Sequence, residues 1–141
     1  MTKNLDKEGL SSIVDNYQLF YVDLWGVVHN GIKLHKNAIN TLSKFHEMNK
    51  QYVLLTNAPR PNTTVKKFLK KLGMQNKMLK KVYTSGEAAL IFLNKKYKNK
   101  KFFHIGPPRD FDLFLKFKKN YISDKLNLFL YYLNLLPCIE I

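Results

Sequence analysis

Two apolar runs in the sequence end on polar residues whose types suit chemistry at phosphorus. Asp23 ends the run "LFYVD", and Thr56, followed by Asn57, ends "QYVLLT". A carboxylate fixed at the end of a strand can attack phosphorus and form an aspartyl-phosphate, and it can also bind a hard Mg²⁺ ion. The Thr56 hydroxyl and the N–H groups after it could hold the remaining phosphoryl oxygens. Gly26 allows a sharp turn that brings further amides to the same centre.

Both polar strand ends also have a simpler interpretation. An aspartate after a strand often caps a turn, and a threonine followed by an asparagine often begins a loop. Taken one at a time, Asp23 and Thr56 favour that interpretation. Placed together at one edge of a sheet, they favour a binding site, because ligands of open α/β sheets bind outside the carboxyl ends of the strands.

The elements that would create such an edge alternate along the chain. Residue types and periodicity predict strands at 19–23, 52–55, 81–86 and 101–106, and helices at 37–48, 62–72 and 87–97. The first of these strands is apolar up to its last residue, so we expect it to be covered on both faces. The alternation predicts an α/β fold, with a parallel Rossmann-like sheet, flanking helices and right-handed crossovers.

The composition weakens several other functions. The formal net charge is +14, but nearly all of it comes from lysine. The predicted helix at 62–72 has a solvated lysine face, and no aromatic residue on that face could stack on bases. Nucleic-acid binding is therefore the least favoured function. A single cysteine, Cys138, excludes an intrachain disulfide framework, and neither a secretory signal nor a membrane span is expected. The expected location is cytoplasmic, and the oligomeric state is not indicated.

Four stretches together resemble the haloacid dehalogenase superfamily. They are "YVDLWGVVHNG", "VLLTNAPRP", "VYTSGEAA" and "FFHIGPPRD", and the resemblance covers residues 9–115. It is strongest to the phosphatase-like branch, class IIA, whose cap domain is inserted after the second motif. The resemblance implies the N-terminal part of a hydrolase core at residues 1–85 and the start of a cap domain at 86–115. Residues 116–141 then form a divergent tail.

The resemblance also implies roles for individual residues. Asp23 would be the nucleophile and a Mg²⁺ ligand, and the backbone carbonyl of Trp25 would be a second ligand. Thr56 would bind phosphate, with Asn57 beside it. The implied activity is a Mg²⁺-dependent phosphatase that acts on a small phosphorylated metabolite through an aspartyl-phosphate.

The sequence departs from the family at the position two residues after the nucleophile. Phosphatases of the superfamily usually carry a second aspartate there, as a proton-transfer group, and this chain has Trp25. An indole cannot take that role. His29 lies close in sequence and titrates near neutrality, but the favoured interpretation is a polar histidine on a surface loop.

The later motifs of the family are a second departure. The lysine and the acidic pair that complete the phosphate and metal sites are absent, and Lys95 and Lys101 fit better in a solvated basic run. We therefore expect the first half of a longer hydrolase, cut or shifted out of frame, with impaired or no turnover. A non-catalytic remnant that holds metal or phosphate is the alternative. Such a half should leave an unpaired sheet edge and uncovered apolar faces.

Overall fold

The computed structural model describes residues 5–123 of the 141-residue chain. Its helices are α1 (Leu5–Glu8), α2 (Lys36–Glu47), α3 (Asn62–Lys71) and α4 (Ser85–Lys96). Its strands are β1 (Leu19–Asp23), β2 (Gln51–Thr56) and β3 (Val82–Thr84). Short 3₁₀ segments are η1 (Leu10–Ser12), η2 (Val14–Asn16), η3 (Asn76–Leu79) and η4 (Pro108–Asn120). The three predicted helices and the first three predicted strands are present, with ends that differ by a few residues.

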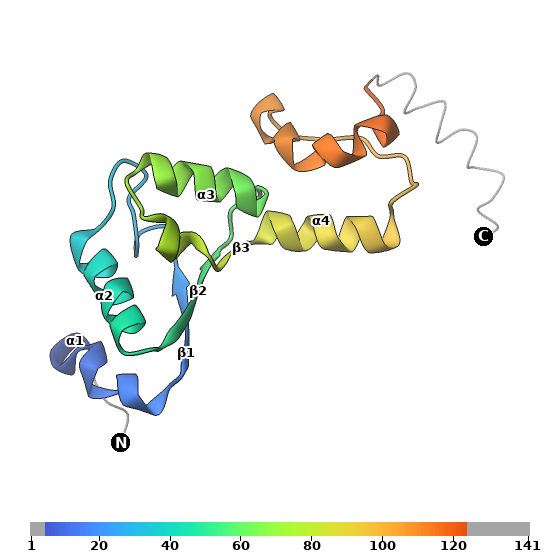
Figure 1. The fold of residues 1–141 in the computed structure, drawn as a ribbon. Coiled ribbons are helices and arrows are strands. Elements are labelled where there is room, and N and C mark those ends of the chain that lie inside the picture. Colours follow the sequence, from blue (N-terminus) through green and yellow to red (C-terminus); the bar gives the residue numbers. More distant parts are fainter. Residues whose placement is uncertain (1–4, 124–141) are drawn as a thin grey trace.

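The three strands form one parallel sheet in the order β1-β2-β3 (Figure 1). Asp23 pairs in register with Leu55, and Thr56 pairs with Thr84, so all three strands end at one edge. The prediction of an α/β fold with a parallel sheet is confirmed. The predicted juxtaposition of Asp23 and Thr56 follows directly from this register.

One face of the sheet packs against the helices and forms the main core. The helices bury the residues that their periodicity predicts: Leu42 and Phe45 on α2, and Val65 and Leu69 on α3. The lysines of α3 lie on the other side, which agrees with the predicted solvated face. Leu54 at the centre of β2 is fully buried among these side chains. The core therefore fixes the strand ends from one side of the sheet.

The opposite face of the sheet is open among the described residues. The register places Tyr21, Leu55 and Tyr83 on this face, and all three are exposed, Tyr21 by 70%. The prediction that the first strand is covered on both faces is therefore wrong for the part of the chain that the structure describes. β1 is also an edge strand there. The expected unpaired edge is present among the described residues, and an uncovered apolar face lies on the sheet.

The predicted fourth strand at residues 101–106 is wrong. This segment is extended but joins no sheet, and its only pairing within residues 5–123 is an isolated bridge between Phe102 and Tyr121. Phe102 N donates to Asn120 O at 3.0 Å, and Ile122 N donates to Phe102 O at 2.8 Å. Aromatic residues favour a strand locally, but a strand needs a neighbour, and here the neighbouring chain is the end of η4.

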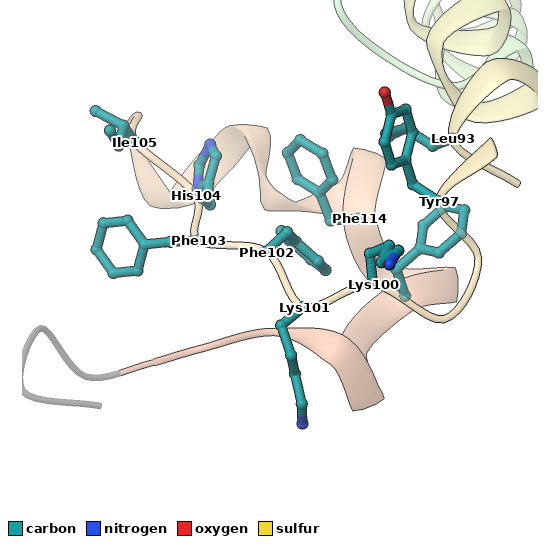
Figure 2. Close-up of a pocket in the computed structure, with 10 residues that line it drawn as sticks. Leu93, Tyr97, Lys100, Lys101, Phe102, Phe103, His104, Ile105 and Phe114 are labelled. Atoms are coloured by element: carbon teal, nitrogen blue, oxygen red, sulfur yellow. The ribbon is translucent and has the colours of Figure 1, made fainter. Parts of the chain in front are cut away.

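Residues after β3 build a second, smaller apolar cluster. Leu90 of α4 packs with Leu113 and Phe117 of η4. Next to this cluster lies a cavity of about 430 Å³, in which Phe102 and Phe114 face each other with their ring centroids 5.2 Å apart (Figure 2). None of the predicted site residues lines this cavity. No helix within residues 5–123 is long and apolar enough to cross a bilayer.

Candidate active site

Two core residues anchor the loop after β1. Leu24 and Val28 are almost completely buried, and Val28 N donates to Leu24 O at 2.9 Å. Gly26 has a φ of 78°, a left-handed conformation that favours glycine, and its N–H donates to His29 O at 2.8 Å. The sharp turn predicted at Gly26 is therefore present. It places Trp25 on the outer side of the loop and His29 on the inner side.

The side chain of His29 in this loop lies in the interior. Its side chain is only 5% exposed, and its Nδ1 accepts a hydrogen bond from Gly31 N at 3.0 Å. The ring packs edge-on against Trp25 and Phe68, with ring centroids 5.5 and 5.4 Å apart. The interpretation of His29 as a surface residue is wrong, because the loop turns the imidazole inward and fixes its direction.

Trp25 is held in place by the same loop. Its indole lies against Gly31, where an added Cβ would be 2.8 Å from the ring, and Gly31 has a φ of 89°. Trp25 nevertheless remains 66% exposed. The position that usually carries the second aspartate is thus occupied by an aromatic ring that packs on Gly31 and is partly exposed.

The loop after β2 is fixed by the start of α4. Ala58 O accepts hydrogen bonds from Gly86 N at 3.1 Å and from Ser85 Oγ at 3.0 Å. Thr84 Oγ1 donates to Arg60 O at 2.6 Å and also accepts from Glu87 N at 2.9 Å, which makes Thr84 the N-cap of α4. The carbonyl groups of the second loop are therefore held by the main chain and the hydroxyl side chains at the start of α4.

Asn62 adds a side-chain link between the same two segments. Thr84 N donates to Asn62 Oδ1 at 2.9 Å, and Asn62 N donates to Glu87 Oε2 at 2.9 Å. This arrangement was not predicted. Thr84 and Glu87 form a Thr-x-x-Glu pattern, which indicates the N-cap of α4 but not Asn62 as its partner.

Two cavities have Thr56 in their lining. The first, of about 320 Å³, is lined by Asp23, Thr56, Asn57 and two residues of the open sheet face, Tyr21 and Leu55. The second, of about 420 Å³, is lined by Thr56 together with side chains of the first loop and of α3. Asp23, Thr56 and Asn57 are thus brought together as predicted. Trp25 lines only the second cavity, and Gly26 lines neither of the two.

Arg60 reaches from the second loop to η4. Its Nη2 lies 2.8 Å from Asp110 Oδ1 and its Nη1 lies 3.1 Å from Asp112 Oδ2. Thr64 Oγ1 also donates to Asp112 Oδ2 at 3.1 Å. Because one guanidinium faces two carboxylates, Arg60 carries no spare charge for a phosphate. The contact instead ties the second loop to the segment after α4.

The pKa of His29 lies below its ordinary value of 6.5. Burial is the main cause, since it disfavours the charged imidazolium, and the nearby His35 acts in the same direction. The Asp23 carboxylate opposes both by favouring the charged form. His29 is therefore neutral in the folded chain at neutral pH.

This lowered pKa predicts a pH dependence of stability. The unfolded chain binds a proton at His29 more readily than the folded chain, so the free energy of unfolding falls as the pH drops below about 6.5. Denaturant unfolding at about pH 7.5 and about pH 5.5, in metal-free buffer, measures this loss. His29→Asn, which cannot titrate, should lose less stability than the parent chain over the same interval. An equal loss in both chains would contradict the assignment.

Comparison with known proteins agrees with the fold. The family profile described as haloacid dehalogenase-like hydrolase matches residues 20–117. Because this is more than half of the chain, the chain belongs to the haloacid dehalogenase-like hydrolase family. The resemblance found in the sequence motifs is thus confirmed. No curated protein matches the sequence.

Solved structures give the same result. A haloacid dehalogenase-like hydrolase from Brucella suis aligns with a TM-score of 0.67 and 30% identity, covering 75% of this chain and 38% of that chain. A 4-nitrophenylphosphatase from Thermotoga maritima aligns with a TM-score of 0.59 and 23% identity, covering 79% of this chain and 42% of that chain. A p-nitrophenyl phosphatase from Archaeoglobus fulgidus aligns with a TM-score of 0.58 and 16% identity, covering 74% of this chain and 40% of that chain. The chain thus spans about two fifths of the length of these relatives.

Proposed function

We propose that the chain carries the nucleophile half of a phosphatase that acts on a small phosphorylated metabolite. The observation that carries the proposal is the shared cavity of Asp23 and Thr56 at the carboxyl edge of the sheet. Two of the matched solved structures are phosphatases by name, which supports the same reaction class. Residues 1–85 would be the N-terminal part of the core and 86–115 the start of the cap, which agrees with the separate apolar cluster around Leu90. A cytoplasmic location is part of this proposal.

In the proposed reaction, an Asp23 carboxylate oxygen attacks phosphorus. A new bond forms between that oxygen and phosphorus while the bond from phosphorus to the ester oxygen breaks, leaving an aspartyl-phosphate. The Thr56 hydroxyl and the amides near Asn57 hold the phosphoryl oxygens during this transfer. Water then attacks phosphorus and releases Asp23. Because Trp25 cannot donate a proton, the leaving oxygen takes its proton from water, which makes the reaction slow.

The residues present fit a Mg²⁺ ion only as a minimal donor set. Mg²⁺ prefers oxygen ligands and is commonly held by one or two carboxylates together with water and substrate phosphate. The Asp23 carboxylate and the Trp25 carbonyl oxygen would hold it. No cluster of three or more His, Cys, Asp or Glu side chains suited to a metal occurs within residues 5–123. When bound, the ion would neutralise phosphate charge next to Asp23.

The test is hydrolysis of 4-nitrophenyl phosphate by the full chain with Mg²⁺, compared with Asp23→Asn. We expect slow turnover in the parent chain and a fall to background in the variant, because an amide is a far weaker nucleophile than a carboxylate. Asp15→Asn, on a short exposed segment away from the strand ends, is the matched control and should keep the parent rate. Equal rates for the parent chain and Asp23→Asn would contradict the proposal.

A second candidate is a non-catalytic protein that binds phosphate or Mg²⁺ at the same edge. The exposed Trp25 at the proton-transfer position favours it, since this substitution removes catalytic power without closing the cavity. Calorimetry with Mg²⁺ and inorganic phosphate separates the two. Binding without turnover supports the second candidate, and no heat with either excludes it.

A further inference from the structure

The second cavity at Thr56 has walls of a particular kind. The aromatic residues Trp25 and Phe68 line it together with three aliphatic and four polar residues: Leu24, Ala58 and Val65, and His29, Thr56, Arg60 and Thr64. Its volume of about 420 Å³ falls in the range of small-molecule pockets. Because Thr56 lines this cavity and the Asp23 cavity alike, a molecule whose phosphoryl group lay at Asp23 could extend into it.

The His29 imidazole is a polar group in this lining. Its Nδ1 accepts from Gly31 N, so in the neutral ring the hydrogen sits on Nε2. Nε2 has no hydrogen-bond partner among the described residues. Asp112 Oδ1 is the one side-chain polar atom of residues 5–123 that is fully buried without a partner, so Nε2 must border open space. A donor that has no partner in the protein and borders a cavity can be satisfied by a ligand.

The other polar residues of the wall are largely occupied. Arg60 is paired with Asp110 and Asp112, and the Thr64 hydroxyl donates to Asp112. His29 and Thr56 therefore remain as the polar groups that a ligand can use. A sugar or other polyol would bury several hydroxyls without partners, whereas a flat apolar group would fit the aromatic walls.

We propose that this cavity receives the organic part of the substrate, that this part is a compact aromatic group, and that His29 donates its Nε2 hydrogen to the ester oxygen. The inference rests on the proposed function, because it takes the phosphoryl group to lie at Asp23 and Thr56. His29 acts here as a hydrogen-bond donor. It thereby selects an aryl phosphate ester over a phosphate with a polar or very small organic group.

The experiment uses the full chain carrying Asp23→Asn, which removes the nucleophile and keeps an oxygen atom at the position of the proposed Mg²⁺ ligand. Three compounds are titrated with Mg²⁺ present: phenyl phosphate, benzylphosphonate, which keeps the ring but replaces the ester oxygen with carbon, and methyl phosphate, which keeps that oxygen but lacks the ring. Trp25 is the only tryptophan of the chain and lines the cavity, so its fluorescence reports binding directly.

We expect phenyl phosphate to bind about tenfold or more tightly than methyl phosphate, because the ring leaves water. It should also bind more tightly than benzylphosphonate, by the hydrogen bond to His29. His29→Asn keeps an acceptor for Gly31 N but has no group at the position of Nε2. It should therefore abolish the preference for phenyl phosphate over benzylphosphonate and keep the preference over methyl phosphate. Phe68→Ala should abolish the preference for phenyl phosphate over methyl phosphate. Phe92 is an exposed aromatic residue outside the cavity, so Phe92→Ala should change neither preference.

Equal binding of phenyl and methyl phosphate, or no binding of either, would overturn the aromatic cavity. A preference for phenyl phosphate over benzylphosphonate that survives His29→Asn would overturn the role of His29. Turnover of phenyl phosphate by the parent chain judges the proposed function separately. If the binding pattern is observed without turnover, the proposed cavity is supported and the proposed phosphatase activity is contradicted. If turnover is observed without the binding pattern, the activity is supported and the cavity is contradicted.

Discussion

Gly86→Ala should unfold the region that holds the second loop, with a loss of about 3 kcal/mol or more in the free energy of unfolding. A Cβ at position 86 would collide with Arg60 N and Arg60 O. Both are backbone atoms, which no side-chain rotation can move away. The loop is also bound to this position through the hydrogen bond from Gly86 N to Ala58 O. Relief of the clash therefore means breaking this hydrogen bond.

Urea unfolding followed by circular dichroism measures this loss. Gly106→Ala is the matched control, because the atom that a new Cβ would meet there, at 2.7 Å, is His104 Nε2, the end of a movable side chain. We expect the control to change stability by less than about 0.5 kcal/mol. A Gly86→Ala chain as stable as the parent would show that the second loop is not held by this close approach.

Thr84→Val should cost about 3 kcal/mol, although it conserves volume. Thr84 is completely buried, and its hydroxyl serves two partners at once, Arg60 O and Glu87 N. Loss of the helix cap costs about 1 kcal/mol. A carbonyl left buried without its partner costs about 1 to 3 kcal/mol more.

Thr84→Ser is the comparison that isolates the hydroxyl. Serine keeps both hydrogen bonds and loses one methyl group, so its expected cost is about 1 kcal/mol. The midpoint of urea unfolding ranks the three chains as parent, Thr84→Ser and Thr84→Val in falling stability. If serine and valine are equally destabilising, the two hydrogen bonds do not carry the stability of this contact.

The sequence predicted those parts of the fold whose signals are local. The periodicity of α2 and α3 marks the faces that the structure buries, and the polar ends of β1 and β2 lie together because parallel strands must end at one edge. The cavity shared by Asp23 and Thr56 follows from the same rule. These features depend on residues within one element or on the geometry of one sheet.

Features that depend on distant partners were not predictable. An apolar strand such as β1 has the same sequence whether one face or two are covered, so Tyr21 gave no warning of its exposure. The aromatic run at Phe102 favours a strand, but the segment beside it is the end of η4. His29 turns inward only because Gly31 N and two aromatic rings receive it. Each outcome is decided by atoms outside the local pattern.

The open face of the sheet also governs how copies of the chain behave toward one another. An edge strand with free backbone groups, flanked by exposed tyrosine and leucine side chains, can pair with a second sheet. The net charge of +14 works against such encounters, because like-charged molecules repel over about 10 Å at 0.1 M salt. At 1 M salt that range shrinks to about 3 Å, while the attraction between apolar surfaces persists. We therefore expect higher ionic strength to favour association through β1.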